Sequence, residues 1–160
     1  MDANIGLNED AKKSSARVLN NLLSDFYVLL AKTWNFHWNV KGPSFGSYHA
    51  FLESLYDDQI EYIDSTAEEV RSLDFRPLGS LKGFLEHTRI KEYDDLKALP
   101  DALGMLTILK DDYETIIREV RKDVETIEAF KPEDNGTINY LEDMIDKLEK
   151  QTWMIRAHLE

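Results

Sequence analysis

The chain has 160 residues, of which 42% are hydrophobic and 31% are charged, a composition typical of one soluble globular domain. It contains no cysteine, which excludes a disulfide framework and a thiolate metal site and fits a reducing compartment. The formal net charge of −12 disfavours nonspecific binding to nucleic acid or anionic membranes and favours the attraction of cations. The start of the chain shows no signal-peptide pattern, and no apolar run is long enough to span a bilayer. We therefore expect a cytoplasmic protein without a membrane partner.

The first helix is predicted to begin near Asn8 or Asp10, because both residues are good N-caps. Apolar residues then recur every three or four positions, which indicates an amphipathic helix. His37 is in phase with this stripe, and the Gly42-Pro43 pair ends the segment. The stripe comprises Leu19, Leu22, Leu23, Phe26, Leu30, Thr33 and His37.

A second amphipathic helix is expected after this turn and should stop between Asp74 and Pro77. Its stripe comprises Tyr48, Leu52, Leu55, Tyr56, Ile63, Ala67 and Val70. The connection from Pro77 to Pro100 is long for a helix bundle, and we expect a short helix from about Ser80 to His87 within it. A connection of this length allows the chain to cross the bundle, so that the helices before and after it run parallel.

A third helix is predicted to start at Asp101, and the segment from Lys131 to Gly136 should separate it from a fourth. The stripe of the third helix comprises Leu103, Leu106, Leu109, Tyr113, Ile117, Val120, Val124 and Ile127. That of the fourth comprises Ile138, Leu141, Ile145, Leu148, Thr152, Ile155 and Leu159. Four amphipathic helices, one long connection and no strand candidate predict an all-α, up-down-down-up four-helix bundle, with residues 1–160 as a single domain.

Two histidines lie on either side of the Gly-Pro turn, six positions before and six positions after Pro43. If the flanking helices pack antiparallel, the imidazoles of His37 and His49 face each other near the turn, as a metal site requires. The second helix adds carboxylates at Glu53, Asp64 and Glu68, which fall with His49 within an arc of roughly 100°. His49 and Asp64 are nevertheless about 22 Å apart along the helix, so one ion cannot contact both in one chain.

If two copies of this helix pack antiparallel about a two-fold axis, ligands that lie far apart in one chain come close to each other. With the axis midway between Asp58 and Gln59, residue 49 falls opposite residue 68 of the second copy, and residue 53 falls opposite residue 64. The predicted site therefore combines His37, His49 and Glu53 of one subunit with Asp64 and Glu68 of the other. Mixed imidazole and carboxylate ligands suit Fe, Mn or Zn better than Ca or Mg.

Two simpler interpretations stand beside this one. A histidine on an apolar helix face is most often a core residue. The carboxylate stripe also contains Asp57 and Glu61, and a stripe of this kind can be only a solvated helix face. The joint pattern favours the metal site, because two histidines across one turn and two ligand pairs share a single dyad.

These residues resemble the ferroxidase signature of the mini-ferritins, the DNA-protection-during-starvation (Dps) family. The matching pattern is His37-Trp38-Asn39-Val40-x-Gly42-x-x-Phe45-x-x-x-His49, followed by Asp64-x-x-Ala67-Glu68. The resemblance extends over almost the whole chain, with further matches at Glu86-His87-x-x-Ile90 and Lys150-x-x-Trp153-Met154-x-x-Ala157. It implies a ferritin-like subunit, a hollow dodecameric shell, and oxidation of Fe(II), preferentially by hydrogen peroxide, at the two-fold interface.

The resemblance also implies roles for two further residues. The family counterpart of Trp38 lies beside the metal and is a candidate acceptor of oxidising equivalents, with a core or interface tryptophan as the alternative. Asp134 matches one of the aspartates that line the three-fold pores of the family, while the second matching position is Asn139. An ordinary loop aspartate is the alternative for Asp134.

The chain departs from the pattern of this family in three respects. It contains no Glu-x-x-His, the pair that builds an iron site inside one bundle in larger ferritin-like enzymes. The residues before the first core helix are acidic or neutral as far as Lys12, so we expect no DNA binding. Ala50 and Ser54 occupy positions that are often acidic in the family, so that mineral nucleation is expected to be weaker or shifted to the carboxylates of Asp57, Asp58 and Glu61.

The leading interpretation is a homo-oligomeric ferroxidase and iron store that oxidises Fe(II) to Fe(III) and deposits ferric mineral. His37, His49, Asp64 and Glu68 are the predicted catalytic ligands, with Glu53 as a further metal ligand. The oxidant is hydrogen peroxide or dioxygen, and Zn or Mn are possible competitors. The alternatives are a DNA-compacting protein of the same fold and an inert helical bundle whose histidines are core residues.

Overall fold

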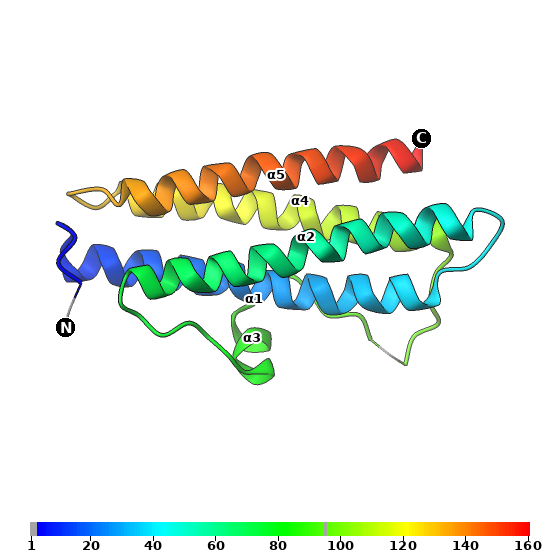
Figure 1. Ribbon diagram of the computed structural model, residues 1–160, viewed down its shortest axis with the longest axis horizontal. Helices are drawn as coiled ribbons and strands as arrows, with labels where there is room; N and C mark the ends of the chain where they lie inside the picture. The colour runs from blue at the N-terminus through cyan, green and yellow to red at the C-terminus, as the bar shows by residue number, and fades with distance from the viewer. Residues whose placement is uncertain (1–2, 95) are drawn as a thin grey trace.

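A computed structural model describes residues 3–94 and 96–160, and within these ranges the regular structure is entirely α-helical (Figure 1). The five helices are α1 (Glu9–Asn39), α2 (Phe45–Ser72), α3 (Leu81–His87), α4 (Ala102–Glu128) and α5 (Asn135–Leu159). The all-α prediction is confirmed, including the short helix in the central connection.

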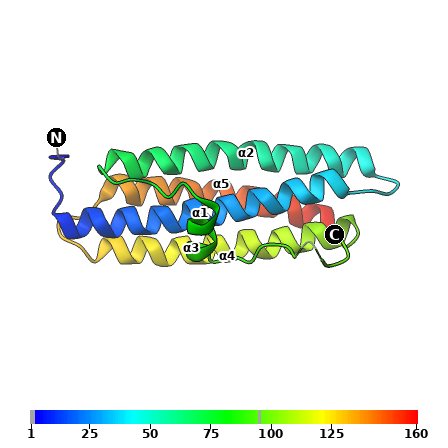
Figure 2. The ribbon, with the colours of Figure 1, turned by 90° about the horizontal axis from the view of Figure 1, so that it is seen from below.

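The four long helices form one bundle with the predicted up-down-down-up topology. The α1–α2 hairpin packs beside the α4–α5 hairpin, and the two views agree that α2 and α4 run in the same direction (Figures 1 and 2). The connection between them returns the chain along the bundle and places α3 against α1 on the outside. The α1–α2 turn and the C-terminus of the chain therefore lie at the same end (Figure 1).

Side-chain caps define most of the helix starts. Asn8 accepts a hydrogen bond from the Ala11 amide, and Ser80, Asp101 and Asp134 do the same for α3, α4 and α5. A cap of this kind pairs one of the otherwise unsatisfied amides of the first turn. The predicted starts near Asn8, Ser80 and Asp101 are confirmed, whereas α5 begins at Asn135, inside the segment predicted to be a break.

Helix α2 ends at Ser72, slightly before the predicted stop between Asp74 and Pro77. The backbone there forms a Schellman motif, in which the Phe75 amide bonds the Val70 carbonyl and the Asp74 amide bonds the Arg71 carbonyl. Asp74 takes the left-handed conformation that this motif needs, with φ of 69°. Glycine usually occupies this position, which explains why the sequence signal for this helix end is weak.

The predicted stripes supply most of the core, although Tyr48, Tyr56, Ile63 and Ala67 of the second helix and Leu159 of the fourth are only partly buried. The stripe residues of the first helix, Leu19 to His37, are all buried, as are those of the third helix from Leu106 onward. Leu103 was predicted as a core residue but is 45% exposed. It lies in the first turn of α4, where it faces a groove beside the α1–α2 turn rather than another helix. The end of the bundle therefore leaves it uncovered.

A buried charge cluster fixes the central connection to the bundle. Arg89 donates through Nε to Oδ2 of Asp25 at 2.8 Å and through its Nη1 to Asp123, while its backbone amide bonds Oδ1 of Asp25 at 2.6 Å. Burial raises the pKa of Asp25 and of Asp123, and the Arg89 guanidinium offsets only part of that effect. Burial alone lowers the pKa of Arg89, but the two carboxylates more than reverse this. The cluster thus pairs two buried carboxylates with one partly buried guanidinium group.

Candidate metal centre

The two histidines of the α1–α2 hairpin lie against each other, as the sequence predicted. Their ring centroids are 3.7 Å apart and the rings are stacked. Nδ1 of His37 lies 3.0 Å from the carbonyl oxygen of His49, and Nδ1 of His49 lies 3.0 Å from the carbonyl oxygen of His37. A carbonyl oxygen only accepts, so each Nδ1 carries the proton and donates it. In a neutral imidazole this tautomer leaves the lone pair on Nε2, the form in which imidazole binds a metal.

Local structure explains how the hairpin brings the rings together. His37 lies in the last turn of α1 and is 8% exposed, while His49 lies in the first turn of α2 and is half-buried. Gly42 in the connecting turn has φ of 125°, in the region that residues with a side chain rarely adopt. The reciprocal hydrogen bonds hold the two helix ends at a fixed separation.

The three predicted carboxylate ligands are exposed on α2. Glu53 lies one helical turn after His49 and accepts a hydrogen bond at 3.3 Å from the Tyr56 hydroxyl group. Asp64 and Glu68 lie further along the same helix. Within residues 3–94 and 96–160 of one chain, no group of three histidine, aspartate or glutamate residues is close enough to hold a metal ion. One chain therefore brings His37 and His49 together but does not add Asp64 and Glu68, so the shared site stays a prediction.

A row of aromatic side chains extends from one side of the imidazole pair. The Tyr56 ring meets His37 edge-on, Trp34 packs next to Tyr56, and Trp38 stacks on Trp34. Trp38 is 68% exposed, which argues against the alternative of a core tryptophan. Trp34 and Tyr56 were not predicted as site residues. Helical spacing was the available signal, since Trp34 precedes Trp38 by four positions and Tyr56 follows Glu53 by three.

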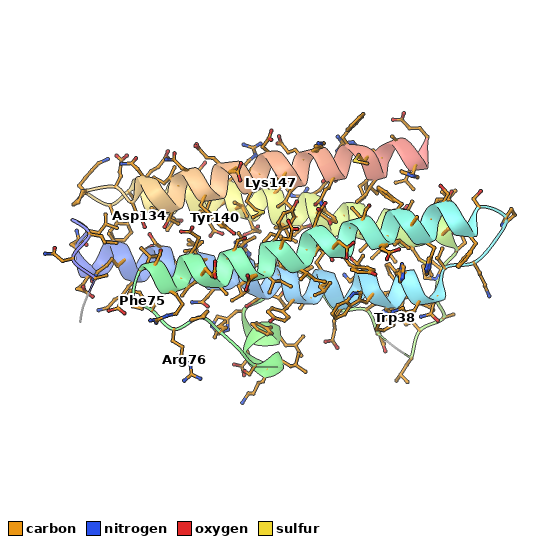
Figure 3. All side chains as sticks on the ribbon, in the orientation of Figure 1. Trp38, Phe75, Arg76, Asp134, Tyr140 and Lys147 are labelled. Carbon is orange, nitrogen blue, oxygen red and sulfur yellow. The ribbon has the colours of Figure 1, made fainter. Side chains whose placement is uncertain are left out.

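Asp134 lies at the opposite end of the bundle from Trp38 (Figure 3). It is 5% exposed, and its carboxylate accepts hydrogen bonds from the backbone amide and the hydroxyl group of Thr137 at 3.1 and 2.7 Å. The pKa of Glu69 on α2 is raised, first by partial burial and then by the charges of Asp134 and Glu68. Asp134 is thus the N-cap of α5 and adds to a negative field at this end, while its role in a pore remains a prediction.

The carboxylates suggested for mineral nucleation differ in their surroundings. Asp58 accepts a hydrogen bond from the Gln151 amide at 2.6 Å. Together with Glu61 it lines a groove of about 540 Å³ between α2 and α5, which Lys147 and Lys150 also line. Asp57 is exposed and does not line that groove. Their role in nucleation is likewise a prediction.

None of the helices in the described part of the chain is both long enough and apolar enough to cross a membrane.

Comparison with known proteins identifies the family. The ferritin-like domain family matches residues 16–160. An uncharacterized low temperature-induced protein of Nostoc sp. is 38% identical over 157 residues, covering 98% of this chain and 86% of the relative. DNA protection during starvation protein 2 of Bacillus anthracis is 36% identical over 149 residues, covering 92% and 97%.

A solved structure shows the same fold over the whole chain. The Dps protein of Vibrio cholerae, described as a member of a broad superfamily of ferritin-like diiron-carboxylate proteins, superposes with a TM-score of 0.90 at 32% identity. The match covers 99% of this chain and 97% of the other. This protein is therefore a member of the Dps family within the ferritin-like proteins.

Proposed function

We propose that this protein is an iron-oxidising and iron-storing mini-ferritin. In this proposal residues 1–160 act as one domain, and two copies share two sites across a two-fold axis. Further copies complete a hollow dodecameric shell in the cytoplasm. The Dps relatives support the family-level part of this proposal. The observation that carries the chemistry is the hydrogen-bonded imidazole pair, which leaves both Nε2 atoms free to bind a metal.

The proposed reaction converts two Fe(II) ions and one hydrogen peroxide molecule, with two protons, into two Fe(III) ions and two water molecules. Iron is the substrate and the cargo. The carboxylates of Glu53, Asp64 and Glu68 draw the cation to the interface and stabilise the higher charge of Fe(III). His37 and His49 hold the ion and leave positions open for the oxidant. Removal of Fe(II) and peroxide together would protect DNA without contact between the protein and DNA.

An anaerobic Fe(II) titration followed by addition of peroxide tests this function. We expect saturable binding of Fe(II) and oxidation much faster than in buffer alone. The double variant Asp64→Asn/Glu68→Gln should lose both. The double variant Asp111→Asn/Glu125→Gln removes the same charge from exposed positions on α4 and should keep both. If the two double variants behave alike, the proposed ligand set is wrong.

The competing metals and oxidants belong to the same assay. Zn and Mn accept the same donor atoms as iron, so Zn(II) added before Fe(II) should lower the number of Fe(II) ions bound. Dioxygen in place of peroxide shows which oxidant the centre uses at the higher rate. These two comparisons do not test the ligand set, which is tested by the two double variants.

A further inference from the structure

The two helical hairpins meet along a polar seam between α2 and α5. Within each hairpin the helices pack closely, whereas a groove of about 540 Å³ separates part of α2 from α5. The Tyr140 hydroxyl group on α5 lies 2.9 and 2.8 Å from the hydroxyl oxygens of Ser65 and Thr66 on α2. Gln151, further along α5, donates a hydrogen bond to Asp58 beside the groove. Side-chain hydrogen bonds therefore hold the two hairpins together along this seam.

The Gln151 amide, which lines this groove, has one atom without a partner. The residue is 5% exposed, and its Nε2 donates to Oδ2 of Asp58 at 2.6 Å. Its Oε1 is buried and has no hydrogen-bond partner among the described residues. Rotation of the amide by 180° does not remove the problem, because it places two acceptor oxygens, Oε1 and Oδ2, against each other. A buried acceptor of this kind calls for a donor or a cation.

The charges that line the groove favour a cation. Asp58 and Glu61 both line it and lie one helical turn apart on α2. Lys147 and Lys150 line it as well, but Lys147 is paired at 2.6 Å with a carboxylate of its own helix. The two carboxylates are therefore opposed mainly by Lys150. Burial, followed by the charges of Asp58 and Glu61, raises the pKa of Tyr62, which lines the same groove.

The groove and the predicted iron ligands occupy different faces of α2. The helix contributes Ser54, Asp58, Glu61 and Ser65 to the polar lining of the groove. At about 100° of rotation per residue, the mean direction of these four side chains differs by about 100° from that of the four predicted iron ligands of α2. The groove thus lies on the α5 side of the helix, away from the face predicted to meet a second copy.

We propose that Asp58, Glu61 and Gln151 bind a hard divalent cation in this groove, with water in the remaining coordination positions. Carboxylate and amide oxygens without imidazole suit Ca, Mg or Mn. On binding, the Gln151 amide turns its Oε1 toward Asp58, and the cation lies between the two oxygens. The ion then links the two hairpins and satisfies the buried oxygen. This site is separate from the proposed iron centre and does not depend on iron oxidation.

Calorimetric titration of the assembled, iron-free protein with Ca(II) tests the site, because Ca(II) prefers oxygen ligands. We expect saturable binding of one Ca(II) per subunit. Gln151→Met keeps the net charge and the approximate length of the side chain but removes the amide oxygen, and should weaken binding about tenfold or more. Gln151→Glu supplies a carboxylate oxygen at the same position and should bind at least as tightly as the parent. Equal affinity of Gln151→Met and the parent would overturn the proposal.

Two double variants separate the groove from the other candidate cation sites. Asp111→Asn/Glu125→Gln removes exposed carboxylates of α4, and His37→Ala/His49→Ala removes the imidazoles of the candidate metal centre. Both should keep the Ca(II) affinity of the parent. Because the ion links α2 to α5, Ca(II) should raise the Tm of the parent and of both double variants, and clearly less that of Gln151→Met. Loss of saturable binding in His37→Ala/His49→Ala would place the cation at the metal centre and exclude the groove site.

Discussion

Arg89 holds the buried carboxylates of Asp25 and Asp123, and its loss would leave both without a cationic partner. We expect Arg89→Met to lower the free energy of unfolding by about 3–5 kcal/mol at pH 7, the usual cost of breaking a buried ion pair. Arg121→Met removes an arginine from an exposed pair with Glu149 and should stay within about 1 kcal/mol of the parent. Urea denaturation at one fixed protein concentration measures both, and equal losses would contradict the assignment.

The pH dependence of that loss follows from the raised carboxyl pKa values. Asp25 and Asp123 have folded pKa values above the ordinary value of 3.8, so just above pH 3.8 the folded chain binds more protons than the unfolded chain. Their contribution to stability is therefore largest below pH 3.8 and falls as pH rises through the raised values. Without Arg89 these pKa values rise further, and protonation relieves the buried charge. The defect of Arg89→Met should thus shrink as the pH is lowered from 7 towards 4.

Two substitutions at Asp134 separate its capping role from its predicted role in a pore. Asparagine is as good an N-cap as aspartate but carries no charge. Asp134→Asn should therefore keep the stability of α5 and slow iron uptake at low salt, if a ring of carboxylates concentrates the cation. Asp134→Ala should in addition cost about 1 kcal/mol through loss of the cap. Uptake by Asp134→Asn that matches the parent at every salt concentration would exclude Asp134 from the iron path.

Among the elements, the end of α2 offers a test of backbone conformation. Asp74 adopts φ of 69° at the C′ position of the Schellman motif, where glycine carries no steric penalty. Asp74→Gly should stabilise the protein by up to about 1 kcal/mol, and Asp74→Val should destabilise it by at least as much because a β-branched residue resists this conformation. The shift in the urea midpoint measures both. A stabilising valine would show that the motif does not determine where α2 ends.

The same helix end shows which parts of the fold a sequence can predict. The starts at Asn8, Ser80 and Asp101 were predictable because each cap is made by the side chain of that residue with an amide three positions later. The end of α2 depends on an aspartate in a position usually held by glycine. The exposure of Leu103 depends on where the bundle stops, which a three- and four-residue period does not encode.

The candidate site and the buried charge cluster also differ in how far the sequence predicts them. The facing imidazoles were predictable because a hairpin needs only two helices and a turn of known length. The cluster of Asp25, Arg89 and Asp123 joins residues 64 and 34 positions apart, through a connection whose path the sequence pattern does not specify. The partner carboxylates Asp64 and Glu68 lie on the same helix as His49, and only a second copy of the chain can bring them to it.

At the scale of the whole molecule, the net charge of −12 predicts how the protein behaves toward DNA. Binding to duplex DNA requires several lysine or arginine side chains that displace condensed counterions, and each copy in an oligomer adds the same negative charge. We expect no retardation of duplex DNA at physiological salt and neutral pH. The gel-shift assay must contain a chelator, because divalent metal could bridge two acidic surfaces. Salt-sensitive retardation under these conditions would favour the DNA-compacting alternative.

The predicted site across the two-fold axis can be tested by mixing two defective proteins. His37→Ala/His49→Ala and Asp64→Ala/Glu68→Ala should each lose fast oxidation of Fe(II) by peroxide as homo-oligomers. In a mixed dimer, one site combines both defective halves. The other combines His37, His49 and Glu53 from the second variant with Asp64 and Glu68 from the first, and is complete. Unfolding the two variants together and refolding them should therefore restore part of the activity.

Random pairing of equal amounts of the two variants gives a defined expected recovery, which makes the result quantitative. If the subunits pair at random, about half of the dimers are mixed and each mixed dimer has one complete site of two, so about a quarter of the parent activity should return. Native mass spectrometry reports the fraction of mixed dimers, and separately refolded variants combined afterwards provide the control. A site built within one chain gives no recovery at any mixing ratio, because each subunit then lacks either its imidazoles or its carboxylates. The separation of about 22 Å along α2 between His49 and Asp64 excludes such a site on geometric grounds, so we expect the mixed protein to be active.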